Sequence, residues 1–423
     1  MKTGLKNIRL ISPGHELDGQ QIDMVIGNGK ILSVNHGIEL ADEVIDIPGL
    51  CVSAGWVDLR ATTGEPGFEH RENLLTVANA AARGGFTQVA ILPAKAPVTQ
   101  SRGALDFVRS QGKNLPVQLL PMAALTVDLG GNDLTEITDL HHGGAIAFTD
   151  GTRALSRADV LVKALEYVKP LNGLVIQRPE QKDLASGGVM HEGIRSTMLG
   201  LKGVPAVAEE VMLERDLQLL RYTGGKIHFS LISTRRAVSL IKEARRDGLN
   251  VTCDIAAHQL AFTDESMAAF DTNYKVSPPF RSESDLEALK SGLADSTIDA
   301  IVSDHRPYDV EGKELEFDLA EFGITGLETA FAVANTFMAK EMALEVLLKK
   351  FTDGPRKILC LEQPLLEEGA QANLTLFDPE KEWVFEQNQT ESKSYNSPFY
   401  GVTLKGKVFA TCINGQFTKN RYW

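Results

Sequence analysis

Short apolar runs alternate with turn residues at both ends of the 423-residue chain. Near the N-terminus the runs are NIRLIS, QIDMVIGNGKILSV and EVIDIPGL, and the Gly-Asn-Gly stretch in the second is typical of a tight hairpin. The C-terminal part has the same pattern in ANLTLFDP, EWVFE and GVTLKGKVFATCINGQFT. We therefore predict that residues 1–50 and 356–423 together build one composite β-sandwich domain.

The middle of the chain, residues 51–355, alternates strand-like runs with helical stretches. The strand-like runs are GWVDLR, TQVAILP, VQLLPMAAL, GAIAFTD, GLVIQRP, KIHFSLIS, LNVTCDIA and TIDAIVSD. ENLLTVANAAARGG ends on glycines, and TRRAVSLIKEARRDG has basic residues in its last turn, as helices do. This alternation predicts an α/β fold, a TIM-like (β/α)8 barrel whose chemistry lies where strands end and loops begin.

Composition narrows the class of protein. Hydrophobic residues make up 43% and charged residues 23% of the chain, as in soluble globular proteins with a large core. The net charge of −13 argues against partners such as nucleic acid or an acidic membrane surface. No run reaches the roughly 18 apolar residues of a membrane span, and the N-terminus lacks the apolar core of a signal peptide. We expect a cytoplasmic protein that binds small molecules or other proteins.

Segments near the predicted strand ends resemble those of bacterial dihydroorotases of the amidohydrolase superfamily, in order and over nearly the whole chain. They are GWVDLRATTGEPGFEHRE, GGFTQVAILPAKAP, AFTDG, LASGGVMHEGIRSTMLGLKGVPAVAEE, HFSLISTRRAV, NYKVSPPFR, TIDAIVSDHRPYD, EFGITGLETA and SKSYNSPFYG. The resemblance implies the amidohydrolase barrel. In active members it also implies a zinc centre, which activates a bound water and polarises the carbonyl as the dihydroorotate ring opens or closes.

The four histidine ligands that the resemblance implies are all replaced here. Active members end the first strand in DxHxH, whereas this chain has Asp58, Arg60 and Thr62 in that frame. The histidine after strand five corresponds to Arg178, and the histidine after strand six corresponds to Leu231. Arginine stays protonated and repels a metal cation, so we predict that the metal pocket is degenerate and holds no zinc.

Two acidic positions of the family centre have counterparts. The metal aspartate after strand four corresponds to Asp150, with the alignment open by one residue, and Asp304 matches the catalytic aspartate that binds metal and shuttles the proton. A carboxylate without an activated water is a weak base, so we expect Asp304 not to function in catalysis. The substrate-binding positions are also replaced, and the residues standing there are Gly64, Ala94, Ser277 and Tyr308.

The two arginines have a predicted structural role. Arg60 and Arg178 would supply the positive charge that zinc supplies in active members, by pairing with Asp58, Asp150 or Asp304. The alternative is that both arginines point outward into solvent at the barrel mouth.

The remaining candidate groups do not form an evident site in the sequence. The nine histidines are His15, His36, His70, His141, His142, His191, His228, His258 and His305. Of these, His258 and His305 lie nearest the predicted mouth, but two scattered imidazoles make a poor metal site. The nucleophile candidates Ser303, Thr149 and Cys253 have no neighbouring base in the sequence.

Three functions stay open. We expect an inactive dihydroorotase homologue, a homo-oligomer, that serves as a structural or regulatory partner of aspartate carbamoyltransferase, a partner that the resemblance implies. The alternative is an active dihydroorotase, which converts carbamoyl aspartate to dihydroorotate, or another cyclic-amide hydrolase with an unorthodox metal centre. The third is a small-molecule sensor that uses the vestigial pocket.

Overall fold

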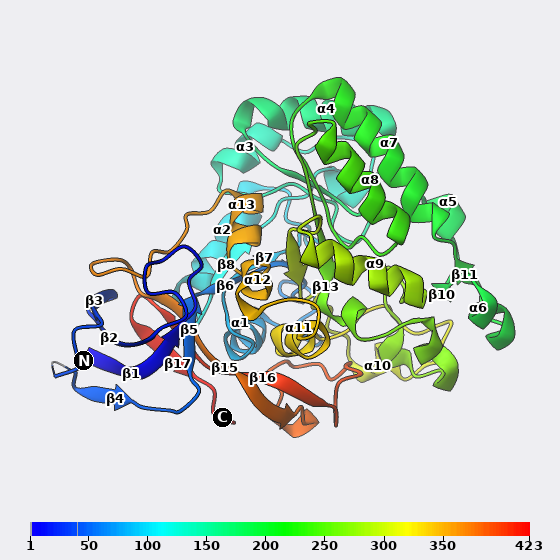
Figure 1. Cartoon of the computed structure of the whole chain (residues 1–423). Helices are drawn as coiled ribbons and strands as arrows, with labels where there is room; N and C mark the ends of the chain where they lie inside the picture. Colours follow the sequence, from blue (N-terminus) through cyan, green and yellow to red (C-terminus); the bar gives the residue numbers. More distant parts are fainter. Residues whose placement is uncertain (1, 40) are drawn as a thin grey trace.

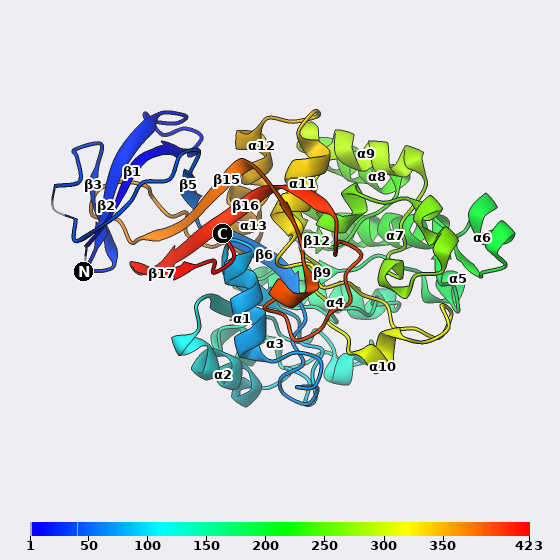
Figure 2. The ribbon, with the colours of Figure 1, turned by 90° about the horizontal axis from the view of Figure 1, so that it is seen from below.

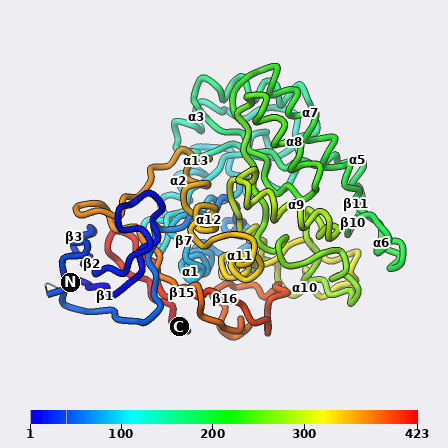
Figure 3. Tube along the Cα trace, in the orientation of Figure 1, coloured from blue at the N-terminus to red at the C-terminus, as the bar shows by residue number. Residues whose placement is uncertain are grey.

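The computed structural model describes residues 2–39 and 41–423. A sheet built from both ends of the chain lies on one side of the molecule, and parallel strands covered by helices make up the rest (Figure 1). Both termini lie beside that sheet (Figure 3). Within the described residues, no helix is both long and apolar enough to cross a membrane.

The terminal sheet has eight strands. Seven of them follow the order β17-β16-β15-β5-β1-β2-β3, and β4 pairs with β1 outside this order. Its strands are β1 Lys2–Leu10, β2 Gln21–Gly27, β3 Lys30–Val34, β4 Glu43–Ile45, β5 Cys51–Ala54, β15 Asn373–Val384, β16 Thr403–Ile413 and β17 Gln416–Lys419. Hydrogen bonds between β5 and β15 join the two chain ends. The strands are joined by hydrogen bonds into one continuous sheet around a shared apolar core. The predicted sandwich and its boundaries at residues 50 and 356 stay a prediction.

Two hairpins of this sheet follow directly from local sequence. Asn28 and Gly29 connect β2 to β3 with φ angles of 53° and 79°, and Asn414 and Gly415 connect β16 to β17 with 49° and 77°. Positive φ at both central residues defines the turn whose twist matches paired strands, and Asn-Gly tolerates it best. The hairpin predicted at Gly-Asn-Gly is confirmed.

Seven of the eight predicted inner strands are present, namely β6 Trp56–Ala61, β7 Phe86–Ile91, β8 Gln118–Pro121, β9 Val175–Gln177, β12 Ile227–Phe229, β13 Val251–Ala256 and β14 Ala300–Val302. They form parallel sheets in the orders β6-β7-β8 and β9-β12-β13-β14. The fourth prediction is reduced to Phe148, which bridges Ala123 after β8 and Val175 in β9. A parallel bridge between Ala61 and His305 joins the ends of β6 and β14.

Helices cover the outside of these strands (Figure 1). They are α1 Leu74–Arg83, α2 Arg102–Gln111, α3 Ile137–His142, α4 Ala158–Val168, α5 Lys182–Ala185, α6 Ile194–Leu199, α7 Val207–Thr223, α8 Arg235–Arg246, α9 Glu283–Ala294, α10 Val310–Lys313, α11 Ala330–Met338, α12 Leu344–Lys349 and α13 Asp353–Leu359. Both helices predicted from the sequence, α1 and α8, are confirmed. The side chains of Asn73 and Thr234 accept hydrogen bonds from the backbone N–H groups of Thr76 and Ala237 and so start these helices.

Short elements complete the chain. The two-residue strands β10 Met190–His191 and β11 Gly203–Val204 pair in parallel outside the inner strands. The 3₁₀ helices are η1 Gly112–Asn114, η2 Val127–Leu129, η3 Lys169–Leu171, η4 Ala257–Leu260, η5 Asp264–Ala269, η6 Thr272–Tyr274 and η7 Gln387–Gln389.

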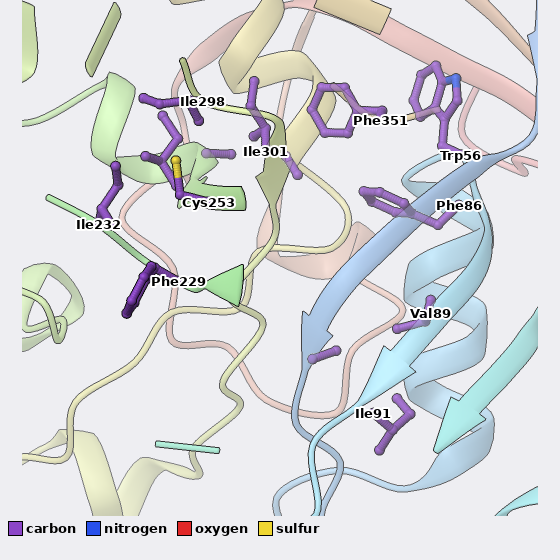
Figure 4. Packing of buried hydrophobic residues seen from close by; sticks show 14 of the residues in the cluster. Trp56, Phe86, Val89, Ile91, Phe229, Ile232, Cys253, Ile298, Ile301 and Phe351 are labelled. Atoms are coloured by element: carbon purple, nitrogen blue, oxygen red, sulfur yellow. The ribbon is translucent and has the colours of Figure 1, made fainter. Parts of the chain in front are cut away.

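The main core is organised around Trp56, which is fully buried at the start of β6. Its ring centroid lies 4.5 Å from Phe331 of α11, 5.2 Å from Phe377 of β15 and 5.9 Å from Phe351. Figure 4 shows Trp56, Phe86 and Phe351 together at one end of the cluster. Figure 2 shows β15 and β16 running beside α1 and α11. Aromatic packing therefore fixes the terminal sheet against the inner strands.

We expect Trp56→Ala to lower the free energy of unfolding by about 3–5 kcal/mol, because it removes an aromatic side chain from a close-packed core. Chemical denaturation followed by circular dichroism measures this loss. Tyr222→Ala is the matched control, since Tyr222 on α7 is 79% exposed and should change stability by less than about 0.5 kcal/mol. Equal effects of the two substitutions would contradict the central role of Trp56.

Candidate functional site

Two buried aspartates come from neighbouring strands of the barrel, Asp58 within β6 and Asp304 just after β14. Asp58 accepts hydrogen bonds from the backbone N–H and the hydroxyl of Ser303, both at 2.7 Å. Burial raises the pKa of the Asp58 carboxyl to about 7, although the Ser303 hydrogen bonds oppose the shift. Ser303 is thus engaged as a hydrogen-bond partner of a carboxyl group and has no neighbouring histidine base in these contacts.

Arg60 and Asp304 form the central ion pair of the mouth. The guanidinium Nε of Arg60 lies 2.8 Å from Asp304 Oδ1, and both residues are 2% exposed. A second guanidinium nitrogen of Arg60 donates to the backbone carbonyl of Gly151 at 3.2 Å. The bridge between Ala61 and His305 sets the register that makes these contacts possible. The predicted pairing of Arg60 with a family aspartate is confirmed, and the outward orientation is wrong for this residue.

Arg178 also points inward, but its partners differ from the predicted ones. It is 6% exposed and contacts Glu180 Oε2 at 2.5 Å, two residues along the chain. It also donates to Ser277 Oγ at 2.6 Å and to the carbonyl of Thr152 at 2.9 Å. The prediction that Arg178 pairs with Asp58, Asp150 or Asp304 is therefore wrong. Instead the side chain links the end of β9 to Ser277, so a position predicted for the metal pocket contacts a position predicted for the substrate pocket.

The Asp150 carboxylate accepts hydrogen bonds from residues of a nearby loop. The backbone N–H groups of Leu125 and Thr126 donate to it at 3.1 and 2.9 Å, and the Thr126 hydroxyl donates at 2.5 Å. Burial raises the pKa of Asp150, and the hydrogen bonds from Thr126 oppose that shift. The prediction that an arginine neutralises Asp150 is wrong, because loop donors satisfy it instead.

Two residues of the mouth have strained backbones. Leu231 and Asp304 have φ angles of 61° and 41°, values that residues other than glycine rarely adopt. Leu231 is 2% exposed and packs in an apolar cluster with Leu59, Leu120 and Val302, inside the ring of strands. Strain of about 1–3 kcal/mol at one residue is typical of functional sites. Position 231 therefore has the strained backbone that is typical of functional sites, but its side chain is aliphatic.

None of the remaining predicted positions carries a cationic side chain that could clamp a carboxylate. A Cβ atom on Gly64 would lie 2.0 Å from the Phe68 carbonyl oxygen, so no side chain fits there without movement of the loop. Ala94 is half-buried, and the Thr62 hydroxyl donates to the carbonyl of His305 at 2.8 Å. The Tyr308 ring packs under the Arg71 guanidinium at 4.7 Å.

The histidines near the mouth face different partners. His258 is 3% exposed, its Nδ1 has no hydrogen-bond partner among the described residues, and burial lowers its pKa to about 4. The Nδ1 of His305 accepts from the backbone N–H of Gly326 at 3.2 Å, and its Nε2 lies 3.4 Å from Glu72. His228 is buried against Asp254 at 2.8 Å. Among the described residues, no three His, Cys, Asp or Glu side chains are grouped so that they could hold a metal ion.

Two features of the mouth were not predicted. The fully buried Glu72 accepts hydrogen bonds from Ser392 and from the backbone N–H of Lys393, residues that lie about 320 positions away in the chain. Lys95 is 5% exposed, its Nζ has no partner among the described residues, and burial lowers its pKa to about 7. For Lys95, the sequence signal was its position inside the apolar stretch ILPAKAP. No feature of the neighbouring sequence indicates the contacts of Glu72.

Comparisons with known proteins agree with this architecture. The sequence model of the family described as Dihydro-orotase-like matches residues 49–237, and that of the Amidohydrolase family matches residues 188–418. A dihydroorotase of Syntrophus aciditrophicus (strain SB) is 39% identical, covering 98% of this chain and 99% of that protein. A dihydroorotase of Pelotomaculum thermopropionicum is 41% identical over 94% of each. L-hydantoinase (dihydropyrimidinase) from Arthrobacter aurescens superposes with a TM-score of 0.87 at 23% identity, covering 99% of this chain and 96% of that structure.

These likenesses place the chain in the amidohydrolase family, with a TIM barrel and a small β domain. Within that class the chain belongs to the dihydroorotase family of pyrimidine biosynthesis.

The residues present do not fit the zinc ion that amidohydrolases typically use. A zinc centre requires neutral imidazoles and carboxylates with free lone pairs. Here a guanidinium stands at position 60 with its Nε directed at the Asp304 carboxylate, and Leu231 offers no ligand atom. The fixed charge of Arg60 would also repel a dication at that place.

We expect Arg60→Met to lower the free energy of unfolding by about 3–5 kcal/mol, because Asp304 would remain buried without a counter-charge. The double variant Arg60→Met with Asp304→Asn should lose clearly less than the sum of the two single losses. Urea denaturation of all four proteins measures the coupling. Arg157→Ala is the control, since its ion pair with Asp159 is half-exposed and should contribute less than about 1 kcal/mol. A cost for Arg60→Met no larger than that of the control would refute the central ion pair.

The buried carboxyl of Asp58 predicts a pH dependence of stability. Its folded-state pKa of about 7 exceeds the unfolded value, so its contribution is present at acid pH and is lost as pH rises through 7. Asp58→Asn cannot titrate. The stability of the natural protein minus that of Asp58→Asn should therefore fall by about 2–3 kcal/mol between about pH 5 and pH 8. Denaturation curves at several pH values test this, and a pH-independent difference would contradict it.

Proposed function

We propose that this protein is a dihydroorotase homologue without zinc and without hydrolase activity, and that it acts in the cytoplasm as a structural or regulatory partner of aspartate carbamoyltransferase. The observation that carries the proposal is the buried ion pair between Arg60 and Asp304 at 2.8 Å. In this pair Arg60 binds the carboxylate of Asp304, the residue that matches the family's catalytic aspartate. A guanidinium keeps its charge in proteins, so it cannot yield this carboxylate to a metal as a neutral ligand would.

The positions matching the substrate clamp support the same proposal. Recognition of a substrate carboxylate needs a cationic fork or several aligned donors. Position 64 has no side chain and no space for one, and Ala94 has no polar atom. Ser277 already receives a hydrogen bond from Arg178. The positions that match the substrate clamp therefore supply no cationic fork.

The role as a partner rests on what remains of the molecule. The family fold is kept, with a large aromatic core and a terminal sheet packed against the barrel, while Arg60 and Asp304 pair at the mouth. A folded scaffold with a degenerate active site is suited to binding another protein, and we propose a homo-oligomer in complex with the transferase.

A second candidate is an active dihydroorotase or another cyclic-amide hydrolase with an unorthodox metal centre. The identity of 39% with a dihydroorotase over nearly the whole chain favours it. So does His258, a buried imidazole whose Nδ1 is without a partner among the described residues. One imidazole near one paired aspartate falls short of the three protein ligands of catalytic zinc sites.

Two measurements on the purified protein separate these candidates. Elemental analysis gives the bound metal, and a dihydroorotate hydrolysis assay gives turnover; we expect neither stoichiometric zinc nor activity. Co-expression with aspartate carbamoyltransferase from the same organism, followed by affinity capture and size-exclusion chromatography, tests the partner. We expect a stable complex with the natural protein. Stoichiometric zinc together with turnover would establish the second candidate, and a clean failure to associate would refute the partner role.

Restoring two histidines should not restore an enzyme. We expect the double variant Arg60→His with Thr62→His to remain inactive, because positions 178 and 231 still lack imidazoles and position 64 lacks a clamp. It should also be less stable than the natural protein, since Asp304 loses its buried partner. A hydrolysis assay in zinc-containing buffer and a thermal denaturation curve measure both outcomes. Measurable turnover would show that the remaining pocket is competent.

A further inference from the structure

A strip of exposed acidic and apolar side chains follows β14, in the segment that contains α10. Its apolar members Val310, Leu315 and Leu319 are 55%, 45% and 64% exposed. Its exposed acidic members are Glu311, Glu314, Glu316, Asp318 and Glu321. Together these residues are called the α10 surface. Figures 1 and 2 show α10 on the side of the molecule away from β1, β2 and β3. Exposed apolar side chains grouped among polar ones are typical of protein-binding surfaces.

The acidic side chains of the α10 surface are not neutralised within the protein. Asp309, just before the surface, lies 3.6 Å from His70. Among the residues that the structure describes, no basic side chain forms an ion pair with a carboxylate of the α10 surface itself. No three acidic side chains there form a group that could hold a metal ion, again among the described residues. The α10 surface therefore presents uncompensated negative charge.

The two lysines nearest this strip hold its backbone instead of its carboxylates. Lys313 and Lys275 are 5% and 1% exposed. The Lys313 ammonium donates to the backbone carbonyl of Glu321 at 2.8 Å, and that of Lys275 donates to the backbone carbonyl of Asp318 at 3.0 Å. Phe317 is buried in an apolar cluster beneath the strip. The exposed side chains therefore stand on a fixed backbone, which lowers the entropy cost of binding a partner.

A pocket of about 230 Å³ opens beside α10, between α10, η6 and η7. The lining residues that carry rings or carboxylates are Tyr308, Tyr395, Tyr400, Asp309 and Glu314. Aromatic faces and carboxylates both attract cations. Lys313 also lines the pocket, but its ammonium group is held by backbone carbonyls. The pocket therefore suits a basic side chain of a partner, and arginine is among the residues that most often anchor protein interfaces.

Charge complementarity selects the kind of molecule that fits the α10 surface. A second copy of this chain carries the same net charge of −13 and is repelled on average. Nucleic acid and acidic membranes are repelled for the same reason. A protein that presents basic side chains among apolar ones would cover Val310, Leu315 and Leu319 and pair with the surrounding carboxylates.

We propose that the α10 surface is the docking site for a protein with a basic and apolar face, and that a basic side chain of this partner enters the pocket beside α10. The inference rests on the proposed function, which supplies the partner, aspartate carbamoyltransferase.

Isothermal titration calorimetry of the full-length protein with purified aspartate carbamoyltransferase from the same organism tests the docking site. We expect the triple variant Glu311→Lys, Glu314→Lys and Glu316→Lys to bind at least tenfold more weakly than the natural protein, because it reverses the charge of the surface. Leu315→Ala with Leu319→Ala should weaken binding several-fold. Binding of the natural protein should also weaken as salt is added, because salt screens exposed charges.

The triple variant Glu166→Lys, Glu214→Lys and Glu287→Lys is the matched control. It makes the same change in net charge at exposed carboxylates of α4, α7 and α9, and it should bind as the natural protein does. Circular dichroism checks that all variants fold, and the side chains replaced are all exposed.

The outcomes separate this inference from the proposed function. If the natural protein binds the transferase and the two triple variants bind it equally well, the partner role holds and the docking site is wrong. If the natural protein does not bind, both proposals are refuted. Size-exclusion chromatography of the protein alone covers the remaining occupant. A change of oligomeric state in the α10 variant, but not in the control, would assign the surface to a second copy and overturn the inference.

Discussion

The buried ion pair between Arg60 and Asp304 is the interaction on which the organisation of the barrel mouth depends. An isolated charge in this position would be strongly unfavourable, so each residue requires the other. The pair connects the ends of β6 and β14, and its second contact, to the Gly151 carbonyl, extends it to the fourth strand position. A fixed guanidinium thus provides the positive charge that holds the strand ends together.

The other acidic groups of the mouth are neutralised by different means. Asp58 is held by Ser303 and has a pKa near 7, so much of its population is protonated at neutral pH. Asp150 is satisfied by loop donors, and Arg178 is paired with Glu180. Because each carboxyl group has different hydrogen-bond or ion-pair partners, the acidic groups of the mouth do not form one shared charge network. The buried carboxyl groups of the mouth are therefore satisfied by protein groups alone.

The two ends of the barrel differ in what they offer to other molecules. At the mouth, Arg60 pairs with Asp304 and Arg178 pairs with Glu180 and Ser277. Glu72 binds Ser392 of the distant C-terminal segment. Away from the mouth, a cavity of about 550 Å³ lies between β8, the end of α2 and the turn that joins β16 to β17.

The sequence by itself determined the local elements and the loss of ligand atoms. Asn-Gly turns, helix caps and apolar runs depend only on residues close together in the chain, so a hairpin such as that at Asn28 could be predicted. The sequence also shows directly that positions 60 and 231, which hold Arg60 and Leu231, carry no imidazole. Only the tertiary structure decided which partners the buried charges have. Arg178 contacts Ser277 and Glu72 contacts Ser392, because these contacts depend on distances between strand ends and loops far apart in the chain. The fourth predicted strand is only a bridge at Phe148, and the terminal strands form one sheet. Both outcomes depend on the neighbouring strands as much as on the local sequence pattern.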